Sequence, residues 1–569
     1  MLNRQTYRFA TCLLATWAAL LLSSPGYAEE GHFSNPILPG GYPDPSICSD
    51  GDYWYLVNST FEYFPALPIH RSKDLVNWEL IGHGLNRESQ VTGAVNLVDV
   101  QSNGGIHAPT IRCGKGKFYI ITTNVYQATD GSPTQMVNFV ITADSAQGPW
   151  SDPHVLEGAP GIDPDIFFDD DGRVWYLGTH SPENPAFPGE GEIWLQEIDP
   201  ANWSLSGQRH FLWRGACGGT WVEGPHLYKH DGRYYLVVAE GGTSFNHAVM
   251  VAVSDTITGP YQSNPRNPIL TSRHLSYDHW VNSTGHADLF QLADGRWYMV
   301  ALGIRAEFNR RSNMGRETHL VPVSWEREPF EWKEVKYDWP VVSPLSGRVE
   351  RQYPLPFSEN KQNRASEFID DFDHGQLNLQ WNFRRFPRPG TWSLEDKPGY
   401  LRLHSQPDVI HERGRASLLG IRQTESSFSF ETRMLFSPVS NGSESGIVLI
   451  QKDDNYISLT LKRENDQYLL QLSLATAGAM PVVIKKVPVE KYPGEIYLKI
   501  ITRDDDFAFD WALHETGEYR EFARLDGDLV LSNGYTGAYL GLHGTTNGQQ
   551  QAEHADFDWV MYQIRPANE

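Results

Sequence analysis

Cysteine is scarce in this chain, with four residues among 569. None of them forms a Cys-X-X-Cys pair, which excludes the metal and redox sites built on that spacing. Cys12 lies in an N-terminal segment that we expect to be removed, so Cys48, Cys113 and Cys217 remain. Three cysteines allow at most one disulfide, and the sequence does not choose the pair. A disulfide framework therefore does not hold this fold together.

Basic residues are also in deficit, with 47 Lys and Arg against 70 Asp and Glu and a formal net charge of -23. A nucleic-acid-binding surface needs basic groups that displace counterions, and an anionic membrane surface attracts basic segments. The charge balance argues against both kinds of partner. Hydrophobic residues make up 40% and charged residues only 21%, which indicates a folded chain rather than a disordered one.

Long apolar runs are absent except at the N-terminus. There, Arg4 and Arg8 precede an apolar run at 9–22 and a small-residue end at 26–28. This layout is typical of a secretory signal peptide, here residues 1–28, with cleavage after Ala28. The run is short for a transmembrane anchor, and no later stretch approaches the length of a membrane span. We therefore expect an exported protein, periplasmic or secreted, with no membrane span.

A turn followed by an aromatic-rich strand occurs five times in the first 345 residues. The turn is Asp-Gly in four of the copies, which is a strong signal for a β-hairpin. Successive copies are about 60 residues apart, and a regular period of this length with short strands is typical of a propeller. We predict a five-bladed β-propeller at 29–345, with the shared tyrosine of the copies at Tyr55, Tyr119, Tyr176, Tyr235 and Tyr298.

The period ends at a linker, residues 346–366, which contains Pro354 and Pro356. Beyond it apolar residues alternate with polar ones, as at Leu470, Leu472 and Leu474. This period of two predicts half-buried strands. Many such strands that lack the 60-residue repeat favour an antiparallel β-sandwich at 367–569. The expected fold class is all-β, with two domains.

Titratable side chains occur at one equivalent position in all five repeats. Each precedes the first aliphatic residue of the strand that should line the propeller channel, so residues far apart in sequence are expected to converge there. Three carboxylates in one place suit hydrolysis of a glycosidic bond, which needs one acid to protonate the leaving oxygen and one base to activate water. The alternative is that each carboxylate only caps a turn or forms hydrogen bonds within the core of its blade. The five residues are Asp44, His107, Asp163, Glu223 and His286.

The motifs around the three carboxylates resemble those of glycoside hydrolase family 43. The matching segments are Pro43-Asp44-Pro45, Ile162-Asp163-Pro164 and Glu223-Gly224-Pro225. The resemblance implies that Asp44 is the general base, that Asp163 orients the catalytic groups and tunes the acid's pKa, and that Glu223 is the general acid. It also implies hydrolysis with inversion, acid and base standing roughly 6.5–9.5 Å apart.

The same resemblance suggests substrate-binding roles for four further residues: Phe61, His107, His286 and Arg316. Phe61 would form an apolar wall, although core packing is an alternative, and Arg316 would face the sugar, although an ion pair with Glu317 explains it almost as well. His286 matches a channel histidine that in some relatives helps to hold calcium through waters; the alternative is a hydrogen-bonded channel residue. No cofactor is expected for the chemistry. Whether the channel holds a structural calcium ion is left undecided by the sequence.

Two departures from the family pattern concern the channel. The second-blade aromatic residue of the xylosidase members is His107 here, so the identity of the released sugar is left undecided. Asp165 adds an acid whose role the sequence does not define.

The C-terminal region resembles the accessory domain of β-xylosidase-type members, in which a loop closes part of the pocket. Residues 534–539 are the best match for that loop. We therefore expect an exo-acting, inverting hydrolase that releases xylose or L-arabinofuranose from hemicellulose or arabinan oligosaccharides. The alternatives are an endo-arabinanase-like or other five-bladed glycosidase, or a non-catalytic glycan-binding propeller. Oligomeric state is left open.

Overall fold

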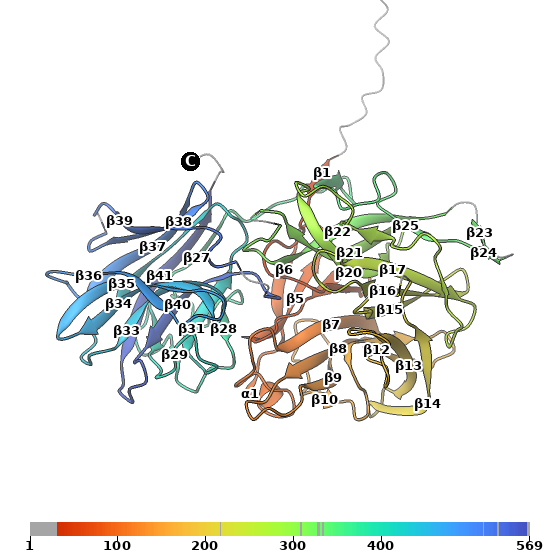
Figure 1. Cartoon of the computed structure of the whole chain (residues 1–569), viewed down its shortest axis with the longest axis horizontal. Coiled ribbons are helices and arrows are strands. Elements are labelled where there is room, and N and C mark those ends of the chain that lie inside the picture. Colours follow the sequence, from red (N-terminus) through yellow and green to blue (C-terminus); the bar gives the residue numbers. More distant parts are fainter. Residues whose placement is uncertain are drawn as a thin grey trace, which may run out of the picture.

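The protein consists of two β-rich bodies, shown side by side in the computed structural model of Figure 1. The structure describes residues 31–216, 218–307, 310–326, 330–332, 335–515, 517–531 and 534–565. The one helix among them is the single turn α1 (Glu88–Val91). The predicted signal peptide, residues 1–28, lies outside the described residues.

The first body is a ring of five antiparallel sheets, one for each sequence repeat. Blade 1 contains β2 (Ser46–Ser49), β3 (Trp54–Val57), β5 (Ala66–Ser72) and β6 (Glu79–Leu85). Blade 2 contains β7 (Gly105–Gly114), β8 (Lys117–Tyr126), β9 (Gln135–Ala143) and β10 (His154–Val155). Blade 3 contains β11 (Ile162–Phe168), β12 (Val174–His180), β13 (Glu192–Asp199) and β14 (Ser204–Trp213).

Blades 4 and 5 complete the ring. Blade 4 contains β15 (Glu223–His230), β16 (Arg233–Glu240), β17 (Ala248–Ser254) and β18 (Gln262–Ser263), with β19 (Leu270–Thr271) paired to β17. Blade 5 contains β20 (Val281–Gln291), β21 (Trp297–Arg305), β22 (Arg316–Trp325) and β25 (Pro340–Val342). A small hairpin of β23 (Phe330–Trp332) and β24 (Val335–Tyr337) projects from it, and β1 (His32–Ser34) pairs with β26 (Gln352–Pro354).

Glycine in the left-handed region explains the repeated turn. Each hairpin between the first two strands of a blade contains a glycine with positive φ, which a residue with a Cβ adopts less readily. These glycines are Gly51, Gly116, Gly172, Gly232 and Gly295. The ring closes where Leu38, near the N-terminus, bridges Thr318 of β22.

The second body is a sandwich of two sheets around one apolar core, which includes Phe430, Leu459 and Leu498. One sheet has the order β29 (Trp392–Ser393), β30 (Leu401–His404), β41 (His554–Ile564), β32 (Phe428–Leu435), β37 (Glu495–Arg503), β38 (Asp506–Ala512) and β39 (Arg520–Asp526), with β27 (Glu367–Asp370) on β41. The other has the order β36 (Val482–Pro488), β35 (Gln467–Ala475), β34 (Asn455–Glu464), β33 (Glu444–Lys452), β40 (Tyr539–Thr545), β31 (Ser417–Arg422), β28 (Asn382–Arg384) and β4 (Tyr63–Phe64). The predicted fold class, a five-bladed propeller followed by an antiparallel sandwich, is confirmed.

One strand of the propeller chain belongs to the sandwich. β4 pairs with β28, and the rings of Tyr63 and Tyr539 stack with centroids 3.8 Å apart. Beside them the buried Arg384 binds Glu62 at 2.8 Å and Asp453 at 2.6 Å. The two domains therefore share a sheet edge and a buried ion-pair network, which fixes the sandwich against blade 1.

A disulfide joins Cys48 of β2 to Cys113 of β7. It links the innermost strands of blades 1 and 2 and resolves the pairing that the sequence leaves open. Cys217 lies outside the described residues.

Candidate active site

Four of the five predicted channel residues stand near the starts of the innermost strands: Asp44 precedes β2, and His107, Asp163 and Glu223 are among the first three residues of β7, β11 and β15. His286 instead lies in the middle of β20. Four of these strands have a register shift near this point: β7, β11, β15 and β20. Asp44, Asp163 and His286 themselves adopt positive φ, as do Ala108 and Gly224 next to the other two. A bulge or a left-handed residue turns a side chain out of the direction that the regular pleat would give it. Backbone irregularities of this kind are common at functional sites. The repeat therefore sets a backbone irregularity that turns each titratable group toward the channel.

Asp44 is a buried carboxylate held in its ionised form. Its Oδ1 accepts a hydrogen bond from Arg316 Nη1 at 3.1 Å, and its Oδ2 accepts one from Ser59 Oγ at 2.6 Å. Burial alone would raise the pKa of Asp44, but Arg316, then His286 and Ser59, outweigh it and lower the pKa below its usual value. Asp44 is therefore ready to accept a proton near neutral pH.

Glu223 and Asp163 have the opposite electrostatics. Burial, together with the negative charge of Asp44, raises the pKa of Glu223 to about 7. Burial and the charges of Glu223 and Asp44 raise the pKa of Asp163 well above its usual value, although the Gly224 N–H donates to Asp163 Oδ2 at 3.2 Å. Because like charges oppose ionisation of both groups, this pair retains a proton at pH values where an ordinary carboxyl has lost it.

The two histidines are neutral at physiological pH. Burial lowers the pKa of His107 to about 4 and that of His286 to about 4, although the charge of Asp44 acts in the opposite direction on both. His286 Nδ1 lies 3.8 Å from Asp44 Oδ1, and His107 Nε2 lies 3.0 Å from the Asn103 carbonyl oxygen. Both imidazoles are thus placed as uncharged hydrogen-bonding groups beside the carboxylates.

Arg316 is buried at the centre of the site. Besides Asp44, its Nη1 donates to Thr243 Oγ1 at 2.7 Å, while Nε and Nη2 donate to the main-chain oxygen of Tyr535 at 3.2 and 3.1 Å. The neighbouring Glu317 is instead paired with Arg305 at 2.6 Å. The alternative of an Arg316–Glu317 ion pair is therefore wrong.

An aromatic wall flanks these groups. Phe61 is buried with φ of 51°, its ring centroid 4.8 Å from that of His107 and 5.4 Å from that of Tyr535. Tyr535 comes from the sandwich, in the loop predicted to close the pocket, and its N–H donates to Asn103 Oδ1 at 3.0 Å. The structure thus brings all seven predicted residues together and adds an eighth from the second domain.

A second polar layer lies further along the channel. The Arg112 guanidinium donates to Asp165 at 2.8 Å and to Asp288 at 3.0 Å, and both carboxylates are buried. Although burial opposes ionisation, Arg112 holds the pKa of Asp288 at about 2. Asp165, the extra acid of undefined role, is thus one of the two buried carboxylates that share the Arg112 guanidinium. Among the described residues, no group of three or more His, Cys, Asp or Glu side chains is placed to hold a metal ion.

Sequence reasoning missed four residues with clear positions in the site. Ser59 and Thr243 carry the hydroxyls that form hydrogen bonds with Asp44 and Arg316. Arg112 offsets the negative charge of Asp165 and Asp288. Trp221 stands exposed two residues before Glu223. Ser59 and Trp221 each lie two residues before a predicted site residue, Phe61 and Glu223, whereas Arg112 had one available signal: a charged residue within an apolar strand.

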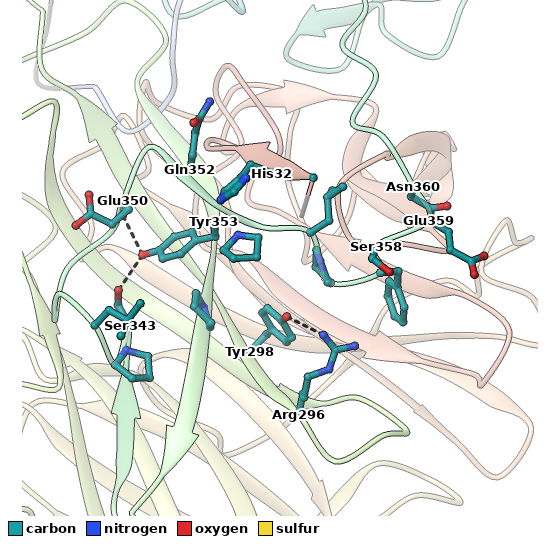
Figure 2. Close-up of a pocket in the computed structure, with 18 of the residues that line it drawn as sticks. His32, Arg296, Tyr298, Ser343, Glu350, Gln352, Tyr353, Ser358, Glu359 and Asn360 are labelled. Carbon is teal, nitrogen blue, oxygen red and sulfur yellow. Dashed lines mark hydrogen bonds between the residues drawn. The ribbon is translucent and has the colours of Figure 1, made fainter. Parts of the chain in front are cut away.

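The cavity shown in Figure 2, of about 1100 Å³, is separate from this site. Its lining includes Arg296 and Tyr298, at the end of blade 5 away from His286, and residues 343–346, Glu350 and 352–360 after the propeller. None of the predicted site residues lines it. Tyr353 is fixed there by hydrogen bonds with Ser343 Oγ at 3.0 Å and the Glu350 N–H at 2.9 Å (Figure 2).

Comparison with known proteins agrees with this arrangement. Residues 33–329 match the sequence profile of glycosyl hydrolases family 43, and residues 369–563 match that of the β-xylosidase C-terminal concanavalin A-like domain. A xylosidase/arabinosidase of Butyrivibrio fibrisolvens is 37% identical over 92% of this chain and 98% of its own. A non-reducing end α-L-arabinofuranosidase of Bacteroides ovatus is 36% identical over 93% of this chain and 94% of its own.

Solved structures show the same architecture over both domains. The crystal structure of a xylan β-1,4-xylosidase from Bacillus halodurans superposes with a TM-score of 0.84 at 31% identity, covering 93% of this chain and 100% of the other. A family 43 protein of Bacteroides ovatus gives a TM-score of 0.82 at 34% identity, with coverage of 94% and 100%. On this evidence the chain is a glycoside hydrolase and belongs to family 43.

Proposed function

We propose that the protein is an exo-acting, inverting glycosidase that releases xylose or L-arabinofuranose from hemicellulose or arabinan oligosaccharides. One observation carries the assignment: the pKa of Asp44 is lowered while that of Glu223 is raised to about 7, in the same channel. Two carboxyls with opposite shifts are the arrangement that acid and base catalysis at one bond requires. The names of relatives, which include both sugars, support the substrate class.

In this mechanism Asp44 removes a proton from a water molecule as that water attacks the anomeric carbon. Glu223 donates its proton to the glycosidic oxygen of the departing group, and Asp163 helps to keep that proton in place until the bond breaks. Arg316 and Ser59 hold Asp44 ionised and oriented. After one turnover Asp44 is protonated and Glu223 is not, and exchange with solvent restores both.

The closed side of the site favours exo action. Tyr535 and Phe61 stand against His107, so the aromatic wall occupies the space into which a continuing chain would have to extend. A terminal sugar needs only one open side. The closed wall therefore favours release of end residues over cleavage within a long polymer.

The channel carboxylates bear on the calcium ion that the family resemblance allows. Its carboxylates Asp165 and Asp288 are both bound by Arg112, and His286 Nδ1 lies 3.8 Å from Asp44 Oδ1. We propose that the Arg112 guanidinium supplies the positive charge of the channel and that no metal is needed there.

Export is proposed from the signal-like segment at 1–28. The disulfide Cys48–Cys113 supports it, because such bonds persist in oxidising compartments. In the part of the chain that the structure describes, no helix is long and apolar enough to cross a membrane.

The proposal is tested with p-nitrophenyl β-xyloside and α-L-arabinofuranoside, followed by NMR of the first sugar anomer formed. We expect turnover of at least one substrate with inverted configuration, and loss of turnover in Asp44→Ala with an unchanged circular dichroism spectrum. Retention of configuration, or full activity of Asp44→Ala, would refute the mechanism.

A further inference from the structure

Trp221 presents a large apolar surface beside the candidate acid. Its side chain is 54% exposed, its φ is 58°, and it precedes Glu223 by two residues at the entry to β15. Large aromatic side chains usually bury most of their surface, so an exposed one at the edge of a catalytic channel suggests a ligand contact.

Two glycines fit closely around this indole. A Cβ at Gly189 would lie 2.9 Å from Trp221 Cε2, and a Cβ at Gly242 would lie 2.9 Å from Trp221 Cδ1. The main-chain N–H of Trp221 also donates to the Gly189 carbonyl oxygen at 2.7 Å. The ring is therefore held in one position by the backbones of two loops, while more than half of its surface remains free to contact a ligand.

The loop at 241–247 connects this ring to the catalytic groups and to further aromatic side chains. Gly242 contacts Trp221. Thr243 accepts a hydrogen bond from Arg316, the same guanidinium that binds Asp44. The Phe245 ring in the same loop lies nearly parallel to the Tyr277 ring, with 6.3 Å between centroids and 14° between planes. The loop thus lies against Trp221 at Gly242 and faces the Tyr277 ring at Phe245.

Tyr277 continues the exposed surface. It is 75% exposed, and the Arg310 guanidinium lies between it and Phe245, 4.1 Å from the Phe245 centroid. Cation–π stacking on the inner face of the Tyr277 ring fixes its orientation and leaves its outer face toward solvent.

We propose that Trp221 and Tyr277 bind the leaving-group side of the substrate by stacking on successive sugar rings of a neutral hemicellulose oligosaccharide. The proposal rests on the proposed glycosidase function. Glu223 marks the oxygen between the released sugar and the remainder, and the aromatic wall of Phe61, His107 and Tyr535 closes the other side. The remainder of the chain therefore leaves past Glu223, where Trp221 stands, and reaches Tyr277 beyond it.

The test compares kcat/KM for two substrates that share the released sugar. One is an oligosaccharide of three or more residues; the other is the glycosyl fluoride, whose leaving group has no ring to stack. Trp221→Ala and Tyr277→Ala should each lower the ratio of oligosaccharide to fluoride kcat/KM by about three- to tenfold, mainly through KM. Trp221→Phe should restore most of the ratio.

Phe211→Ala is the matched control, because Phe211 is 55% exposed but lies on the outer strand β14. It should leave the ratio at the wild-type value. An unchanged ratio in both Trp221→Ala and Tyr277→Ala, or an equal loss on both substrates, would overturn the proposal. Failure of the wild-type protein to hydrolyse either substrate would instead refute the proposed function, so the two failures are distinguishable.

Discussion

The main-chain oxygen of Tyr535 accepts two hydrogen bonds from Arg316, at 3.2 Å from Nε and 3.1 Å from Nη2. A loop of the sandwich thereby holds the arginine that keeps Asp44 ionised. The phenol ring of the same residue faces Phe61 and His107. The second domain thus contributes both to the electrostatics of the candidate base and to the closed wall of the site.

Tyr535→Ala separates these two contributions, because the arginine contact is made by the main chain. We expect KM for oligosaccharides to rise about three- to tenfold as the ring of Tyr535 is lost from the aromatic wall, with a smaller change in kcat. Tyr535→Phe keeps the ring and serves as the control. Steady-state kinetics give the answer, and an unchanged KM in Tyr535→Ala would contradict the role of the wall.

Arg316→Met should move the acid limb of the kcat/KM profile to higher pH. Arg316 lowers the pKa of Asp44, so without it burial raises that pKa and the base stays protonated to a higher pH. An opposite charge at this range is worth about 1 to 3 pH units. Arg71→Met, at an exposed ion pair, is the control. An acid limb that stays in place in Arg316→Met would rule out this coupling.

Arg112→Met should destabilise the propeller, because it leaves Asp165 and Asp288 buried without their partner. Breaking a buried pair costs about 3–5 kcal/mol. The pKa of Asp288 is depressed to about 2, so the stability that this pairing contributes is present above the unfolded pKa and is lost as pH falls toward 2. The difference in unfolding free energy between wild type and variant should therefore shrink between about pH 4 and pH 2.

Denaturant titrations across this pH range measure that difference, and a constant difference would contradict the account.

Treatment of the wild-type protein with EDTA should leave its activity unchanged. Loss of activity that calcium restores would show that Arg112 does not replace a metal.

Glu223→Ala should lose about 10² to 10⁴ in kcat/KM on oligosaccharides, the usual contribution of a general acid. A 2,4-dinitrophenyl glycoside needs little protonation of its leaving group, so its loss should be much smaller. Asp44→Ala is the comparison, since removal of the base slows both substrates alike. Equal losses on both substrates in Glu223→Ala would assign the acid elsewhere.

Much of the fold and the centre of the site could be predicted because they follow the repeat. The Asp-Gly turns mark the blades, and the same period places Asp44, Asp163 and Glu223 at equivalent positions. The structure shows these three close enough to shift one another's pKa values. Their catalytic roles remain predictions that the variants above test.

The remaining features depend on contacts outside the repeat. Ser59 reaches Asp44 through the loop that leads into β4, and Arg112 crosses the channel to carboxylates of two other blades. The pairing of Cys48 with Cys113 depends on two innermost strands being neighbours in the ring. No local pattern encodes such contacts, because they arise only when the ring closes.

The central claim is that Glu223 is protonated, and Asp44 ionised, in the working enzyme. It is tested most directly by the ratio of kcat/KM between wild type and Glu223→Gln on one oligosaccharide, whose leaving group needs protonation, measured from pH 5 to pH 9. Because the pKa of Glu223 is raised to about 7, wild type should lose its acid above that pH while the variant lacks one throughout. The account predicts a ratio that is constant below pH 6 and falls above pH 7. A ratio independent of pH would show that Glu223 is not the acid.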